Sequence, residues 1–110
     1  MISRKINDSL NGNPKIPGDK SISHRAIIIP AISKGVCEIR NHLKSDDVQN
    51  TLNAFKLMGV KVIENENKLT IYGNGLNSLV KPNKEIYLGN SGTSARLLTG
   101  LLSSQNFKSI

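Results

Sequence analysis

Apolar residues recur along this chain at two different spacings, which predict where its helices and strands lie. The clearest pattern is a stripe spaced by four and three residues, as on one face of a helix: Val48, Leu52, Phe55 and Met58. Ser45 precedes the stripe as a candidate N-cap, and Asp46 and Asp47 place negative charge in the first turn, where the helix dipole favours it. A helix that starts after Ser45 and ends at Gly59 is therefore predicted.

Two further apolar segments follow glycine-containing turns and also predict helices. The first runs from about residue 21 to 33 and should end at Gly35 in a left-handed cap, although Pro30 inside it predicts a kink or a restart. Its continuous apolar run indicates a buried helix whose beginning opens onto a cleft. The second runs from about residue 93 to 102.

Alternating apolar and polar residues predict the strands. Residues 36–40 alternate, residues 60–63 and 68–72 read as an antiparallel hairpin, and residues 85–88 read as a further strand. Weak alternation within residues 1–16 predicts two short strands. Helices and strands thus follow one another along the chain, and we expect an α/β (α+β) fold in which one unit is complete and a second begins.

Composition narrows the classes of function. The 110 residues suffice for one domain at most, and the net charge of +7 favours anionic partners. Nucleic acid is a poor fit because the lysines are scattered and only two Tyr and two Phe could stack on bases. Phosphorylated small molecules satisfy the same charge argument. The single Cys37 excludes an intramolecular disulfide and fits a reducing compartment. No apolar segment approaches a membrane span and no residue cluster has metal-ligand spacing, so we expect a soluble, cytoplasmic protein without a metal.

Residues 17–25 gather three groups that can hold an anion. Lys20, the Ser21 hydroxyl and Arg25 lie in the first turns of the predicted helix, and the last two share one helix face. The first N–H groups of a helix lack partners and carry the positive end of its dipole, so a phosphate or carboxylate is favoured there. The alternative is a basic helix start whose cations are simply solvated. Cations at this end of a helix are disfavoured unless an anion offsets them, which argues for a site.

Residues 89–93 form a second candidate anion site. A predicted strand leads through two glycines into a helix, so bare N–H groups can close on a phosphate. Taken alone, this pattern is more typical of a structural turn between a strand and a helix. Arg96, one turn into the helix, adds positive charge or pairs with a carboxylate.

Three motifs resemble, in order and approximate spacing, those of the 3-phosphoshikimate 1-carboxyvinyltransferase (EPSP synthase) family. They are Pro-Gly-Asp-Lys-Ser-Ile-Ser-His-Arg-Ala at residues 17–26, Leu-Lys-Ser-Asp-Asp at 43–47 and Leu-Gly-Asn-Ser-Gly-Thr-Ser-Ala-Arg-Leu-Leu at 88–98. The resemblance covers essentially the whole chain, which matches only the beginning of a family enzyme several times longer. It implies the transfer of the enolpyruvyl group of phosphoenolpyruvate to the 5-hydroxyl of shikimate 3-phosphate, with no cofactor.

The resemblance also implies a fold. Family enzymes have two domains built from repeated βαβαββ units that close around the substrates. Residues 1–110 would then be a single truncated segment with about one and a half units of this enolpyruvyl-transferase-like fold. Within it, residues 1–16 would be strands, residues 17–73 a first unit and residues 84–110 the start of a second.

Substrate-binding roles are implied for five residues. Lys20 matches the lysine that touches both substrates, and Ser21 and Arg25 match the pair that holds shikimate 3-phosphate, chiefly through its carboxylate. Gly92 matches the residue packed against phosphoenolpyruvate, and Asn90 lies next to it. The catalytic acid and base are not assigned, because their family positions lie beyond this chain.

Other candidate residues are expected to be structural. Asp46 and Asp47 match an acidic pair, for which capping and scaffolding are favoured over the orientation of a substrate-binding side chain. The family accepts histidine or asparagine at His24, so a general-base role is not expected there, and His42 has no visible partner.

Two hypotheses from different classes remain at this point. The first is a truncated or split carboxyvinyltransferase, inactive alone, that self-associates or needs a complementing C-terminal polypeptide. The second is a non-catalytic anion-binding or nucleic-acid-binding module. A run of basic and aromatic residues on one face would favour the second, and the sequence has none.

Overall fold

The structure, a computed structural model, describes residue 12 and residues 16–107. In chain order its elements are α1 (Lys20–Ile32), β1 (Lys34–Arg40), α2 (Asp46–Leu57), β2 (Lys61–Glu64), β3 (Lys68–Asn74), the 3₁₀ helix η1 (Leu76–Ser78) and α3 (Gly92–Leu102). This order confirms the expected α+β class. The two strands predicted within residues 1–16 lie outside the described residues apart from Gly12 and Ile16, neither of which is in a strand.

The three strands form an antiparallel sheet in the order β1-β3-β2. In β3 the alternation sends Leu69 and Ile71 into the core, where both are fully buried. On the outer face the Lys68 ammonium lies 3.3 Å from the Glu38 carboxylate across β1 and β3. The sheet therefore has one apolar and one solvated face, as expected for antiparallel strands.

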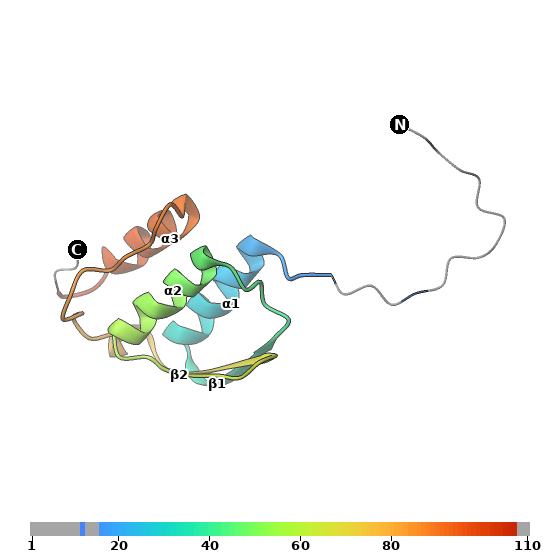
Figure 1. Ribbon diagram of the computed structural model, residues 1–110. Helices are drawn as coiled ribbons and strands as arrows, with labels where there is room; N and C mark the ends of the chain where they lie inside the picture. The colour runs from blue at the N-terminus through green and yellow to red at the C-terminus, as the bar shows by residue number, and fades with distance from the viewer. Residues whose placement is uncertain (1–11, 13–15, 108–110) are drawn as a thin grey trace.

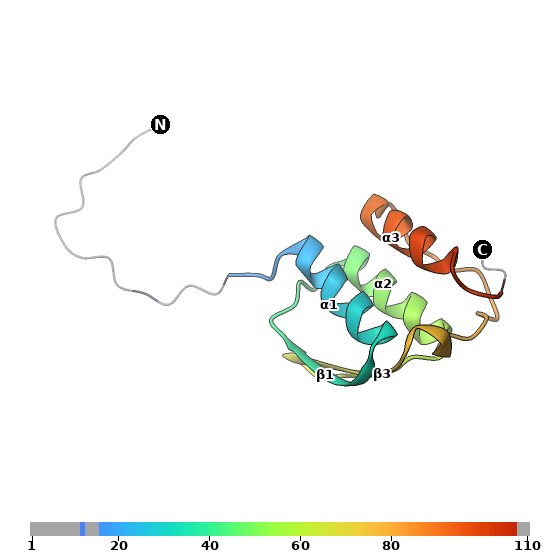
Figure 2. The ribbon, with the colours of Figure 1, turned by 180° about the vertical axis from the view of Figure 1, so that it is seen from behind.

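Helices α1 and α2 cover the apolar face of the sheet, and α3 lies on the far side of these helices from the sheet (Figures 1 and 2). The largest buried apolar side chains come from all three layers: Ile27, Leu52, Phe55, Met58, Leu69, Ile71 and Leu98. Each contributes about 1.5–3 kcal/mol by leaving water, so they hold the layers together.

Helix α2 agrees closely with the sequence prediction. All four residues of its predicted stripe are buried, and the Ser45 hydroxyl accepts a hydrogen bond from the Val48 N–H at 3.3 Å. Gly59 follows the helix with a φ of +87°, a left-handed conformation that glycine adopts without strain.

Helix α1 differs from the sequence prediction in three respects. Of the kink or restart predicted at Pro30, the restart does not occur, since α1 continues to Ile32. Pro30 is the third residue from the end of α1 and removes the N–H that would donate to the Ala26 carbonyl, while the Ser33 N–H donates to the Pro30 carbonyl at 3.2 Å. The helix ends at Ser33 rather than Gly35, because Gly35 is already paired in β1. The expected burial is also incomplete, since Ile22 and Ile29 are 59% and 56% exposed.

The chain passes the end of α1 so closely that Gly73 has no room for a side chain. A Cβ at Gly73 would overlap the carbonyl oxygens of Pro30 and Ser33. The Gly75 N–H also donates to the Ser33 carbonyl at 3.0 Å. Backbone contact between β3 and the end of α1 thus sets how the helix lies on the sheet.

The strand predicted at residues 85–88 is wrong. Its alternation is real, since Ile86 and Leu88 pack against the core while Tyr87 is 76% exposed. A strand also needs a neighbour to pair with, and the described part of the chain brings none beside this segment. The helix predicted after it is confirmed as α3.

Candidate functional site

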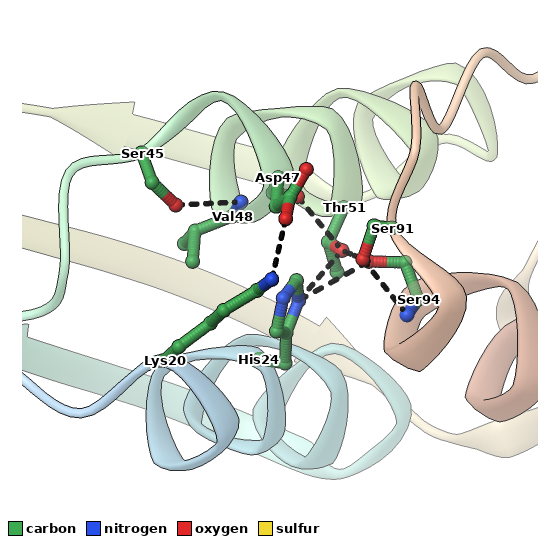
Figure 3. A network of polar contacts seen from close by, with 8 residues as sticks. All are labelled: Lys20, His24, Ser45, Asp47, Val48, Thr51, Ser91 and Ser94. Atoms are coloured by element: carbon green, nitrogen blue, oxygen red, sulfur yellow. Dashed lines mark hydrogen bonds and ion pairs between the residues drawn. The ribbon is translucent and has the colours of Figure 1, made fainter.

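Lys20 and Asp47 join the first turns of α1 and α2. The Lys20 ammonium lies 2.6 Å from the Asp47 carboxylate, with side chains 49% and 27% exposed (Figure 3). The carboxylate fixes the direction of the lysine and leaves half of it open to solvent. Asp47 therefore orients a predicted substrate-binding side chain, the role that the sequence made the less favoured one.

Ser21 and Arg25 are both exposed on α1. None of the described carboxylates lies within ion-pair distance of Arg25. The N-terminus of α1 is less available than the sequence suggested, because the Asp19 carboxylate accepts the Ile22 N–H at 2.8 Å. An anion at this end of α1 would therefore rely on the side chains of Lys20, Ser21 and Arg25 more than on the helix dipole.

The turn before α1 is held by a close backbone approach. A Cβ at Gly18 would overlap the Asn41 carbonyl and the Leu43 N–H, so only glycine fits without movement of the chain. The buried Ser23 hydroxyl accepts the Leu43 N–H at 2.8 Å. These contacts fix the loop before α2 against the start of α1, which places Lys20 opposite Asp47.

The loop before α3 carries the other two predicted site residues. Gly89 has a φ of +59°, Asn90 and Gly92 are exposed, and Gly92 is the first residue of α3. The Ser91 hydroxyl caps α3 by accepting the Ser94 N–H at 3.1 Å. The Arg96 Nε donates to the Gly92 carbonyl at 3.1 Å, which holds the guanidinium beside the start of the helix.

A hollow of about 300 Å³ lies between the starts of α2 and α3. Asp46 and Asp47 line it from α2, and Tyr87, Gly89 and Asn90 line it from the loop before α3. Residues from two of the three sequence motifs thus meet at one depression. Its two carboxylates oppose a bound anion unless cations such as Lys20 balance them.

Behind these surface residues, a buried hydrogen-bond network joins all three helices. His24 Nδ1 lies 2.9 Å from the Thr51 hydroxyl and 3.3 Å from the Ser94 hydroxyl, and these hydroxyls lie 2.6 Å apart. The Ser91 hydroxyl extends the network by donating to Ser94 at 2.8 Å. All four side chains are at most 3% exposed, and Figure 3 shows them converging beside Lys20 and Asp47.

The electrostatics of the two histidines favour their neutral forms. Burial lowers the pKa of His24, the nearby Lys20 ammonium lowers it further, and the Asp47 carboxylate opposes both. Burial likewise lowers the pKa of His42, helped by Lys44 and opposed by Glu64. Protonating either imidazole in the folded protein is therefore harder than in the unfolded chain.

The sequence reasoning did not identify this network, although a signal was present. His24 follows Lys20 by four residues, and Thr51 follows Asp47 by four, so each lies one turn below a member of the surface ion pair. Thr51 also lies within the apolar stripe of α2. A polar residue in an apolar stripe indicates a buried hydrogen bond, because an unpaired hydroxyl there would be unfavourable.

Among the described residues, no helix is long and apolar enough to cross a membrane. The same residues contain no group of three or more His, Cys, Asp or Glu side chains arranged to hold a metal ion.

Comparisons with known proteins identify what the chain is similar to. Residues 4–110 match the family described as EPSP synthase (3-phosphoshikimate 1-carboxyvinyltransferase). A 3-phosphoshikimate 1-carboxyvinyltransferase of Leuconostoc citreum is 53% identical over 89% of this chain and 23% of its own length. One of Oceanobacillus iheyensis is 49% identical over 97% of this chain and 25% of its own.

The solved structure of the EPSP synthase from Acinetobacter baumannii is also similar. It matches with a TM-score of 0.85 and 44% identity over 89% of this chain and 22% of its own. The chain thus spans about a quarter of the length of the relatives that it matches.

Proposed function

Since this chain belongs to the EPSP synthase (3-phosphoshikimate 1-carboxyvinyltransferase) family, we propose that it contributes substrate-holding groups to a carboxyvinyltransferase. The transferase moves the enolpyruvyl group of phosphoenolpyruvate to the 5-hydroxyl of shikimate 3-phosphate and releases phosphate by addition and elimination. Both substrates are anions. Holding them together opposes both their mutual repulsion and the entropy of association, so positioned cations are the main requirement.

The observation that carries this proposal is the ion pair between Lys20 and Asp47 beside the start of α3. It holds one ammonium, half exposed, at the point where the three helices are joined by the His24 network. In the proposed complex Lys20 contacts the phosphate of phosphoenolpyruvate and lies near the reacting hydroxyl. A fixed cation there would stabilise negative charge more effectively than a mobile one.

The remaining site residues divide between the two substrates. Ser21 and Arg25, exposed on α1, bind the carboxylate of shikimate 3-phosphate, for which arginine can supply two parallel hydrogen bonds. Asn90 and Gly92, exposed at the start of α3, lie against phosphoenolpyruvate, where the absence of a side chain at Gly92 lets the backbone approach. We place the acid–base chemistry in the parts of the family sequence that this chain does not match.

This division has consequences for partners and location. The relatives are about four times as long as the matched segment, and we propose that a polypeptide carrying the unmatched part of the family sequence supplies the remaining groups. Self-association through apolar surface would be the behaviour of the chain without it. We also propose that the protein is located in the cytoplasm, because both substrates are phosphorylated metabolites. The alternative of a nucleic-acid-binding module gains no support, since the relatives reported above are transferases.

A hybrid enzyme tests the proposal. Residues 16–107 of this chain would replace the matching residues of the Leuconostoc citreum relative, and phosphate release from phosphoenolpyruvate would be measured with and without shikimate 3-phosphate. We expect turnover that depends on both substrates and that Lys20→Ala abolishes. A folded hybrid that binds neither substrate would overturn the proposal.

The chain by itself provides the second arm of the test. We expect the purified chain to bind shikimate 3-phosphate weakly by calorimetry and to give no turnover, because groups that act as a unit fail together when some are missing. Steady turnover without any complementing polypeptide would contradict the division of roles proposed here.

A further inference from the structure

The buried network under the candidate site reaches each of its three segments. His24 lies one helical turn after Lys20, and Thr51 lies one turn after Asp47. Ser91 and Ser94 flank Gly92 at the start of α3. Figure 3 shows the imidazole between the Lys20 side chain and the two hydroxyls of Thr51 and Ser94. The imidazole therefore lies where it can set the spacing between α1 and α3.

One arrangement of the hydroxyl protons satisfies the whole network. Ser91 donates to Ser94, and Thr51 donates to the Asp47 carbonyl at 3.4 Å. The Thr51 oxygen then has two lone pairs left, which accept the Ser94 hydroxyl at 2.6 Å and His24 Nδ1 at 2.9 Å. In this arrangement every hydroxyl proton has an acceptor and Nδ1–H donates to Thr51. Thr51 could equally donate to a bare Nδ1 at 2.9 Å, so the choice of tautomer rests on the other ring nitrogen.

The other ring nitrogen supports the same assignment. Nε2 of His24 is buried and has no hydrogen-bond partner among the described residues. If Nε2 carried the proton, a buried N–H donor would be left unpaired, which is rare in proteins. An unpaired lone pair on Nε2 is the less unfavourable choice. Burial and Lys20, which lower the pKa of His24, keep the ring neutral.

From these contacts we infer that His24 is a positioning residue, whose Nδ1–H holds the Lys20 end of α1 against the Gly92 end of α3. The inference rests on the proposed function for its consequence, since these two ends carry the residues assigned to the substrates. His24 itself touches neither substrate. It acts through Thr51 and Ser94, and only one edge of its ring is used.

Because only Nδ1 makes hydrogen bonds, two substitutions at His24 can distinguish this role from one in filling space. An asparagine amide can occupy the place of Nδ1 and donate to Thr51, whereas the longer glutamine carries its amide to the place of Nε2. Glutamine is closer to histidine in volume. A role in filling space therefore favours His24→Gln, and a role through Nδ1–H favours His24→Asn.

The experiment measures shikimate 3-phosphate binding to the full chain by calorimetry at neutral pH. We expect His24→Asn to keep the dissociation constant within about threefold and His24→Gln to raise it about tenfold, the usual effect of one lost hydrogen bond. His42→Gln is the matched control and should bind like the unsubstituted chain. Equal binding by the two His24 variants, or stronger binding by His24→Gln, would overturn the inference.

Two readouts need no ligand and separate this inference from the proposed function. Nitrogen-15 spectra of the unsubstituted chain should show His24 protonated at Nδ1 and bare at Nε2. Amide exchange at Ser94, whose N–H donates to Ser91, should stay slow in His24→Asn and become faster in His24→Gln. If the unsubstituted chain binds no shikimate 3-phosphate, the proposed function fails while these readouts still decide the inference. A proton on Nε2 would overturn it even if a variant fails to fold.

Discussion

The Lys20 ammonium contacts the Asp47 carboxylate at 2.6 Å, and both side chains remain partly exposed. An ion pair open to solvent contributes about 0–1 kcal/mol to stability, so folding gains little from it. The ion pair instead fixes the orientation of Lys20, because it holds the ammonium group of this flexible side chain at one position beside the first turns of α1 and α2. Asp47 also keeps a negative charge there, which an arriving anion meets when Lys20 is absent.

The first prediction concerns the cations of α1. Arg25→Ala should weaken shikimate 3-phosphate binding by the hybrid enzyme about tenfold to a hundredfold, the effect of losing a charge-assisted hydrogen bond. Lys20→Ala should weaken it more, because the substitution removes the proposed contact to both substrates and leaves the Asp47 carboxylate unbalanced. Calorimetry on the folded variants gives the dissociation constants.

Lys84 supplies the control for overall charge. It is exposed in the loop before α3 and has no ion pair within the described residues. Lys84→Ala should leave the dissociation constant almost unchanged. If it weakens binding as much as Arg25→Ala, the attraction is diffuse and the proposed site is wrong.

The second prediction tests whether the buried network stabilises the fold. Thr51→Val keeps the shape of the side chain but leaves His24 Nδ1 and the Ser94 hydroxyl without their shared hydrogen-bond partner, which should cost about 1–3 kcal/mol. Thr70→Val is the matched control, because Thr70 is 8% exposed and makes no side-chain hydrogen bond within the described residues. Urea unfolding should show a loss for Thr51→Val only. Equal effects would mean that the hydroxyl of Thr51 contributes nothing specific.

The contrast between α2 and residues 85–88 shows what the sequence could predict. The stripe of α2 and its Ser45 cap are local features, so spacing alone located the helix. The strand predicted at residues 85–88 is absent, because a strand depends on a distant pairing partner that a local sequence pattern does not specify.

The candidate site divides in the same way. Lys20, Ser21 and Arg25 were identified from one short motif, because residues four apart on a helix are neighbours. The link from His24 to Ser94 spans 70 residues and depends on how α1 and α3 pack, which no local spacing encodes. Pro30 was interpreted from its general cost in a helix, yet α1 continues through it to Ile32, and the fully buried Ala31 indicates that packing holds this last turn in place.

The third prediction uses two glycines whose surroundings differ. Gly73→Ala should destabilise the protein by about 1–3 kcal/mol or more, because the new Cβ would overlap two carbonyl oxygens of the α1 end. Gly100→Ala should instead stabilise it by about 0.5–1 kcal/mol, since Gly100 lies inside α3 with nothing within 4 Å of the added methyl group. Urea midpoints of the two variants should therefore move in opposite directions. A shift in the same direction would contradict the close approach of β3 to α1.

The fourth prediction concerns pH. His24 and His42 both have a lowered pKa in the folded protein, whereas an unfolded histidine titrates near its ordinary value of about 6.5. The unfolded chain therefore binds more protons below that value. The contribution of the two neutral histidines to the free energy of unfolding should be complete above about pH 6.5. It should fall as the pH drops through their folded pKa values.

Urea unfolding between about pH 5 and 7.5 checks this dependence, since the window covers the ordinary histidine pKa. His24→Asn and His42→Asn should each flatten the curve, because each removes one group that takes up a proton on unfolding. A stability that rises toward pH 5 would show that the two histidines are easier to protonate in the folded protein, contrary to their surroundings.

The last prediction concerns the apolar surface of α1. Ile22 and Ile29 lie on one side of the helix, two turns apart, and are 59% and 56% exposed, while Val36 at the start of β1 is 64% exposed. A hollow of about 210 Å³ lies between Ile29 and Val36. Such a surface favours association, so the chain without a complementing polypeptide should self-associate as its concentration rises.

The double variant Ile22→Gln and Ile29→Gln should raise the dissociation constant of this self-association at least about tenfold, since each buried isoleucine is worth about 1.5–3 kcal/mol. Sedimentation velocity over a concentration series measures this constant, and Ile63→Gln on β2, where the side chain is 40% exposed, controls for a general loss of apolar area. A chain that stays monomeric at high concentration, or a double variant that associates as strongly as the Ile63→Gln control, would show that α1 is not the contact surface.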